Sequence, residues 1–166
     1  MLTLVAAVGL ALGVSFLCSF VEAGLLSLTP ANVAELSRTD ARAGKIWQTF
    51  KGDIGKPISV ILLLNTTAHT IGAAVAGAKW SELFGDDLLW VFSLAFTFLM
   101  LQYTEILPKT LGVRHRVLFA RKGAVPLAWA VKALLPIISL IHLINRPFEK
   151  KGEAEDGAGD AIREID

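Results

Sequence analysis

Three long stretches of apolar residues constrain the fold of this chain more than any other feature. Residues 1–28 contain one charged side chain, Glu22, and residues 57–78 and 88–104 contain no Asp, Glu, Lys or Arg. Each stretch is close to the ~20 residues that an α-helix needs to cross the hydrocarbon core of a bilayer. The mean hydropathy of +0.57 is also high for a soluble domain. The sequence therefore predicts an all-α integral membrane protein with three transmembrane helices.

A fourth apolar block, residues 124–145, does not read as a simple span. Pro126, Lys132 and Pro136 interrupt it. Proline removes a backbone N–H and clashes with the preceding helical turn. We therefore expect two juxtamembrane half-helices broken at Pro136, which lie along the membrane as a belt or dip into it.

The distribution of basic residues predicts the orientation. Residues 29–56 and 109–122 each carry five Lys or Arg side chains, whereas residues 79–87 carry only Lys79 among three acidic residues. Cytoplasmic loops of membrane proteins are enriched in Lys and Arg. We therefore expect a multi-pass protein of the plasma (inner) membrane, with the N-terminus outside and the C-terminus in the cytoplasm.

Two segments outside the apolar blocks predict structure of a different kind, an amphipathic helix and a flexible tail. Thr29-Pro30 is a typical helix start, and residues 31–51 then predict a cytoplasmic amphipathic helix, which Gly52 to Gly55 ends. Residues 151–166 are acidic and Gly-rich, which predicts a flexible tail after a membrane domain of residues 1–150.

Small residues are spaced for close helix contact. Gly9 and Gly13 form a GxxxG pair in the first apolar block, and Ala68, Gly72 and Ala76 form a similar row in the second. Such rows let helix backbones approach closely in membranes. Because three helices alone would enclose a polar site poorly, we also expect a homodimer.

Glu105 places a carboxylate in an apolar segment, where burying a charge is energetically unfavourable. It lies near the end of the third apolar block, and a charge in or near hydrocarbon marks a functional site by default. Pro108 has no N–H, so in an α-helix the carbonyl of Thr104 loses its partner. A carboxylate beside a free carbonyl predicts a cation site rich in oxygen.

The other two blocks bring polar side chains to a similar depth. Ser15, Ser19 and Glu22 share one helix face, and Asn65 and His69 share another. Hydroxyl, amide and carboxylate oxygens suit hard cations such as Mg²⁺, Ca²⁺ or Na⁺. An imidazole instead suits Zn²⁺, Ni²⁺ or Co²⁺, or a proton-linked step.

Each of these side chains also has a structural interpretation that the sequence leaves open. A serine can bond back to its own helix, an amide or imidazole can join two helices, and a carboxylate can pair with a basic residue. These alternatives apply to Ser15, Ser19, Asn65, His69 and Glu22, and to Glu105 with Lys109 as its partner at i,i+4.

Residues 104–111, Thr-Glu-Ile-Leu-Pro-Lys-Thr-Leu, closely resemble the Gly-Glu-Ile-Leu-Pro-Lys-Thr motif of the CNNM/CorC family, whose membrane domain is also called DUF21. Residues 19–28 and 64–69 resemble two further family segments in the same order, and the resemblance covers roughly residues 1–150. The chain departs from the family at Phe20, Leu64 and Thr104, which stand in place of glycines, and at His69, where the family often has Asn.

The resemblance implies a dimeric Mg²⁺ transporter, an exporter with Na⁺ coupling. The family's ligands correspond to Ser19, Asn65 and the turn of Thr104 and Glu105, with Pro108 and Lys109 as structural residues of the site. Family members continue into a pair of CBS domains that bind ATP-type nucleotides. Residues 151–166 resemble the linker toward such a pair. The expected partners are the lipid bilayer, a second copy and a divalent cation, and not nucleic acid.

Two other functional classes compete with transport. One is a non-transporting membrane module that docks a partner protein through residues 31–51 and the tail. The other is an intramembrane enzyme, which we do not expect. The sequence has no Gly-x-Ser-x-Gly, no His-Glu-x-x-His and no paired catalytic carboxylates at helix spacing. The single cysteine, Cys18, allows no disulfide within the chain.

Overall fold

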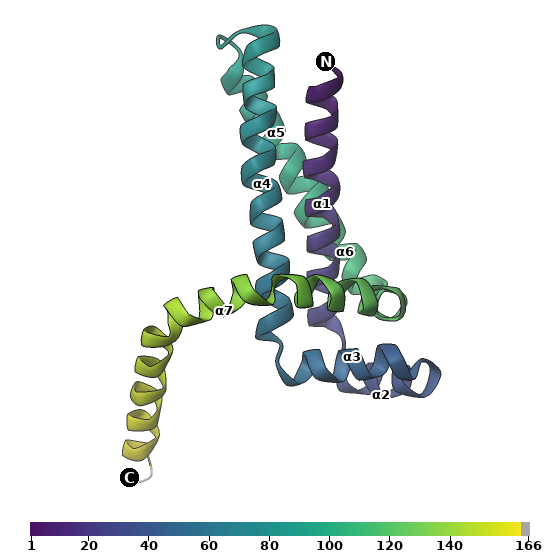
Figure 1. The fold of residues 1–166 in the computed structure, drawn as a ribbon, viewed down its shortest axis with the longest axis vertical. Helices are drawn as coiled ribbons and strands as arrows, with labels where there is room; N and C mark the ends of the chain where they lie inside the picture. The colour runs from purple at the N-terminus through teal and green to yellow at the C-terminus, as the bar shows by residue number, and fades with distance from the viewer. Residues whose placement is uncertain (164–166) are drawn as a thin grey trace. The chain divides into compact units, whose positions relative to one another are not determined.

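The computed structural model describes the backbone of residues 1–163 and the side chains of residues 1–140. All regular elements in this part are helical, which confirms an all-α fold (Figure 1). The elements are α1 (Leu2–Ser27), α2 (Pro30–Thr39), α3 (Ala41–Gly52), α4 (Gly55–Phe84), α5 (Leu89–Met100), a π-helix η1 (Leu101–Ile106), α6 (Leu107–Arg114) and α7 (Arg116–Arg163). Met1–Val131 forms one compact unit and the chain from Lys132 a second.

The three predicted apolar blocks form the long helices of the first unit. Helices α1 and α4 and the continuous run α5–η1–α6 lie side by side (Figure 1). The close contact of α1 with α4 uses the small-residue row, because a Cβ at Gly72 would overlap the side chain of Ala11. Gly9 and Gly13 have no neighbour within 4 Å of such a Cβ. The row in α4 therefore packs within the protomer, and the GxxxG pair does not.

The third apolar block is not a uniform α-helix. Its chain widens into η1 just before Pro108, and the N–H of Leu107 donates to the carbonyl of Gln102, five residues back. Proline clashes with the turn that precedes it, and a wider turn relieves that clash. In this register, the N–H that Pro108 lacks is the one that would reach Tyr103. The expectation that Pro108 frees the Thr104 carbonyl assumed an α-helical register, which the structure replaces here.

The predicted amphipathic helix of residues 31–51 is two helices. Thr29 caps α2 as expected, and its side chain accepts a hydrogen bond from the N–H of Asn32. Asp40 then interrupts the helix and caps α3, accepting from the N–H of Ala43 at 3.0 Å. A short acidic side chain satisfies the first turn of a new helix, and this favours the break.

The expected break at Pro136 is wrong, because α7 runs as one helix through both Pro126 and Pro136. Proline removes only its own hydrogen bond, and the helix continues around it. Helix α7 also extends through Arg163, into the tail expected to lack regular structure. The side chains of that tail and of His142 lie outside the described residues.

Four helices are long and apolar enough to span a membrane, namely Leu2–Ser27, Gly55–Phe84, Leu89–Arg114 and Arg116–Leu140. The chain is thus a multi-pass membrane protein, and the count of three spans stays a prediction. The fourth candidate begins across one end of the bundle rather than along it (Figure 1). Its first turns are held there by Trp47 of α3, whose Nε1 donates to the carbonyl of Ala120 at 2.7 Å.

Candidate functional site

Ser15 lies at the point where three helices meet. Its side chain is fully buried, and its Oγ donates to Asn65 Oδ1 of α4 at 2.7 Å. The same Oγ lies within hydrogen-bond distance of His69 Nε2, one turn further along α4. His69 Nε2 in turn lies 3.3 Å from Thr104 Oγ1 of η1. Four of the polar residues predicted on three separate spans therefore form one connected cluster.

The hydrogen-bond directions assign the tautomer of His69. The one hydroxyl proton of Ser15 goes to Asn65, and that of Thr104 goes to the Met100 carbonyl at 2.6 Å. Both hydroxyl oxygens can therefore only accept from His69, so Nε2 carries the proton. A nitrogen that donates has no lone pair for a metal. In this arrangement His69 bridges three helices, and only its Nδ1 is free to act as a ligand.

Contacts between α1 and α6 indicate the position of Ser19 along the helix bundle relative to this cluster. About two turns after Ser15 in α1, Glu22 Oε2 lies 3.7 Å from Lys109 Nζ of α6. Further on, α6 touches α1 so closely that a Cβ at Gly112 would lie 2.5 Å from the carbonyl oxygen of Phe20. Ser19 lies one turn after Ser15 in α1, so it falls between the levels of the Ser15 cluster and the Glu22–Lys109 pair.

Ser19 is the unsatisfied member of the predicted set. Its side chain is fully buried, and its Oγ has no hydrogen-bond partner among the described residues. A serine inside a helix commonly bonds back to its own backbone, as Ser27 does to Gly24. An orphaned buried hydroxyl costs about 1–3 kcal/mol. This oxygen is therefore free to accept a ligand that would remove the cost.

Glu105 is the predicted carboxylate without a protein partner. It is half-buried, and no hydrogen bond or ion pair to its carboxylate is found within residues 1–140. The predicted i,i+4 partner, Lys109, contacts Glu22 instead. The wider turn of η1 shifts Glu105 out of α-helical phase with Lys109. Glu22 is thus paired with a basic residue, as its structural interpretation predicted.

The structure thus separates the predicted residues into two groups. Ser15, Asn65, His69 and Thr104 are hydrogen-bonded to one another, whereas Ser19 and Glu105 retain free oxygens. No cluster of three or more His, Cys, Asp or Glu is found among the described residues. The oxygens left free are the Ser19 hydroxyl and the Glu105 carboxylate, which are donor types that hard cations accept. The π-helix η1 was not predicted, and Pro108 was the residue that could have indicated it.

We expect His69→Leu to destabilise the bundle by about 1–2 kcal/mol, because interhelical hydrogen bonds in membranes contribute about 0.6 kcal/mol on average and two are lost. The measurement is reversible unfolding in mixed detergent micelles. Thr70→Val, at an exposed neighbouring position, is the matched control and should leave stability unchanged. Equal stability of the two variants would contradict the bridging role of His69.

Comparison with known proteins places the chain among membrane domains of one kind. Residues 5–164 match the family described as the Cyclin M transmembrane N-terminal domain, CNNM. A UPF0053 protein of Synechocystis is 32% identical over 148 residues, which are 89% of this chain and 43% of that protein. A chloroplastic DUF21 domain-containing protein of Arabidopsis thaliana is 25% identical over 87% of this chain and 22% of its own length.

A bacterial relative carries a location in its name. The UPF0053 inner membrane protein YfjD of Escherichia coli is 23% identical over 125 residues, which are 75% of this chain and 29% of that protein. The chain therefore spans less than half the length of these curated relatives.

Proposed function

The chain belongs to the CNNM transmembrane-domain family, a family associated with metal transport, and from that premise we propose that it carries a divalent cation, Mg²⁺ first, through a site at the η1 turn. The observation that carries the proposal is the buried Ser19 Oγ, which has no hydrogen-bond partner, together with the Glu105 carboxylate, which has no ion-pair partner within residues 1–140. Asn65 Oδ1 supplies a third oxygen, since a carbonyl oxygen that accepts from Ser15 keeps a second lone pair.

The chemistry of this set favours Mg²⁺ over softer metals. Ser19, Asn65 and Glu105 offer only oxygen, and the backbone carbonyls of the Tyr103–Thr104 turn add more. Mg²⁺ is held by one or two carboxylates and keeps several waters. Because His69 Nε2 donates its proton to the hydroxyls, the site lacks the imidazole lone pair there that Zn²⁺ would use. Na⁺ is also an oxygen-binding cation and is the proposed coupling ion for export.

Mg²⁺ flux into and out of proteoliposomes tests the proposal, with Mg²⁺-dependent thermal stabilisation of the purified protein as the binding measurement. We expect Mg²⁺ to stabilise the protein and cross the membrane, and an inward Na⁺ gradient to speed export. Flux equal to that of empty liposomes would support the second candidate, a scaffold without transport. The observation that favours this second candidate is the closed hydrogen-bonded cluster around Ser15.

The proposed orientation has α2, α3 and the start of α7 in the cytoplasm. Basic side chains gather at this end of the bundle, where Lys51 donates to the Leu25 carbonyl and Arg116 to Asn32. In a Cys18→Ala background, we expect Arg38→Cys to resist an impermeant thiol reagent added outside cells, and Asp86→Cys to react. Labelling in the reverse pattern would invert the topology.

The proposed assembly is a homodimer. Gly9 and Gly13 present an open small-residue face on α1, because nothing in the protomer lies within 4 Å of a Cβ placed at either position. Such a face suits the close approach of another helix. We expect a dimer by mass measurement in lipid nanodiscs and a shift to monomer in Gly9→Ile/Gly13→Ile. A monomeric parent protein would refute the assembly.

A further inference from the structure

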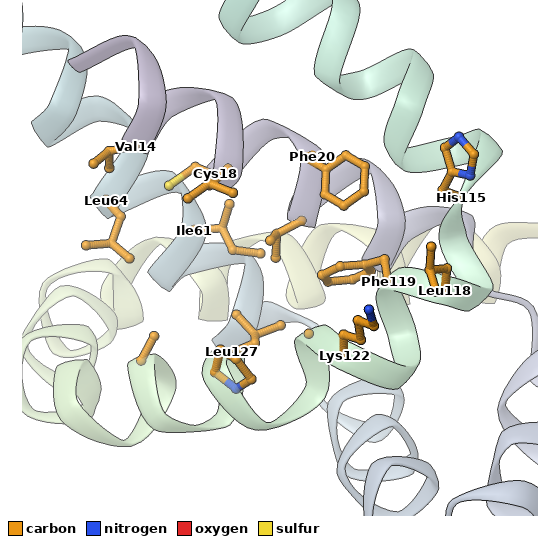
Figure 2. Close-up of a pocket in the computed structure, with 15 residues that line it drawn as sticks. Val14, Cys18, Phe20, Ile61, Leu64, His115, Leu118, Phe119, Lys122 and Leu127 are labelled. Atoms are coloured by element: carbon orange, nitrogen blue, oxygen red, sulfur yellow. The ribbon is translucent and has the colours of Figure 1, made fainter. Parts of the chain in front are cut away.

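An apolar groove of about 550 Å³ runs between α1, α4 and the start of α7. Figure 2 shows its wall, which includes Val14, Cys18, Ile61, Leu64, Phe119 and Leu127. All lining residues belong to the compact unit of Met1–Val131. The groove is separate from the polar cluster, because none of Ser15, Ser19, Asn65 or Glu105 lines it.

One end of the groove is polar. His115 lies at that end, Leu118 and Phe119 lie between it and Lys122, and Val14 and Leu64 lie at the other end (Figure 2). Both polar side chains are exposed, so the stem of Lys122 can line the groove while its ammonium group stays in the headgroup region. The groove therefore has the two-part character of an amphiphile site, with a cationic mouth above an apolar channel.

The chain segment that carries His115 and Lys122 is basic. Residues 106–148 contain seven Lys or Arg side chains and no Asp or Glu. Of these, Arg121 adjoins Lys122 and is exposed, and Arg116 lies five residues before Arg121 in α7. Basic pockets between membrane helices on the cytoplasmic side recruit the headgroups of anionic lipids.

We propose that this groove binds one anionic phospholipid, with an acyl chain against α1 and α4 and the phosphate at Lys122 and His115. Exposed Leu17 and Leu118 form the groove's edges, so a chain can enter from the bilayer. A second copy of the protein is the less suitable occupant. A symmetric contact here would set two strips of basic residues against each other, and like charges oppose such an interface.

The test is native mass spectrometry of the purified protein after exchange into micelles that contain phosphatidylglycerol and phosphatidylcholine in equal amounts. We expect retention of one phosphatidylglycerol in preference to phosphatidylcholine. Lys122→Gln should reduce that preference about fivefold, the effect of one basic charge near a membrane surface. Lys45→Gln, an exposed lysine of α3 outside the groove, is the matched control and should retain the parent's preference.

A second variant and a second readout separate groove binding from binding elsewhere. Ala130→Trp fills the groove and should reduce retention of both lipids. Phosphatidylglycerol with a photoreactive acyl chain should label peptides that contain Cys18, Leu64 or Leu127. Equal retention of the two lipids by the parent protein, an unchanged preference in Lys122→Gln, or labelling spread evenly over all helices would overturn the proposal. So would crosslinks between two copies across the groove with no lipid retained.

Discussion

Glu105→Gln is expected to raise the Kd for Mg²⁺ about 100-fold and to abolish flux in proteoliposomes. Glutamine keeps the shape of the side chain and removes the single charge that the proposed site offers. Losing one charged partner in a partly buried site costs about 3 kcal/mol, which corresponds to that change in Kd. Folding should be nearly unaffected, because the Glu105 carboxylate has no ion pair or hydrogen bond within residues 1–140 to lose.

Glu22→Gln is the matched control, since Glu22 is also half-buried and close in level but is paired with Lys109. It should bind Mg²⁺ within a few-fold of the parent and lose a little stability. Mg²⁺ binding and flux of Glu105→Gln at the parent's values would remove Glu105 from the site. A larger binding loss in Glu22→Gln than in Glu105→Gln would move the carboxylate ligand to Glu22.

Gly112→Ala is expected to destabilise the bundle by about 1–3 kcal/mol and to weaken Mg²⁺ binding as well. The new Cβ would lie 2.5 Å from the Phe20 carbonyl oxygen and 3.1 Å from the Gly24 nitrogen. Both are backbone atoms, so no side-chain rotation relieves the overlap and α6 must move away from α1. Pro108 lies one turn before Gly112, so the same movement would displace the proposed ligands of the η1 turn from Ser19.

Gly77→Ala on α4 is the control for this prediction, because nothing lies within 4 Å of its Cβ position and it lies outside the proposed dimer face. It should unfold at or slightly above the parent's denaturant midpoint, since alanine favours helix. Unfolding in mixed micelles and Mg²⁺-dependent stabilisation measure the two effects. Parent-like behaviour of Gly112→Ala in both assays would show that the α1–α6 contact is looser than described.

The sequence predicted the helical blocks well because the bilayer leaves few alternatives. A backbone in hydrocarbon must satisfy its own hydrogen bonds, so a long apolar block becomes a helix. The points where helices end or continue outside these blocks were harder to predict. Asp40 is tolerated inside helices and also caps them, and only its contact with Ala43 decides between the two. The continuity of α7 through Pro136 likewise depends on local geometry rather than on residue type.

The candidate site was predictable in its members and less so in its pairings. Depth along each span predicted that Ser19, Glu22, Asn65 and Glu105 lie at a similar level. The hydrogen bonds of the structure instead join Ser15, Asn65, His69 and Thr104. The sequence indicated an ion pair of Glu22 with a basic residue only as an alternative to a role for Glu22 in the site. The Glu22–Lys109 pair forms where the wider turn of η1, just before Pro108, moves Lys109 out of α-helical phase with Glu105.

A structure of the protein in lipid nanodiscs at saturating Mg²⁺ tests the central claim most directly. The account predicts one ion bound by Ser19 Oγ, Asn65 Oδ1 and the Glu105 carboxylate, at about 2.1 Å from each oxygen it contacts directly. His69 should still bridge Ser15 and Thr104 beside it. A map in which the oxygens of Ser19, Asn65 and Glu105 hold no ion at saturating Mg²⁺ would contradict the account and favour a membrane scaffold.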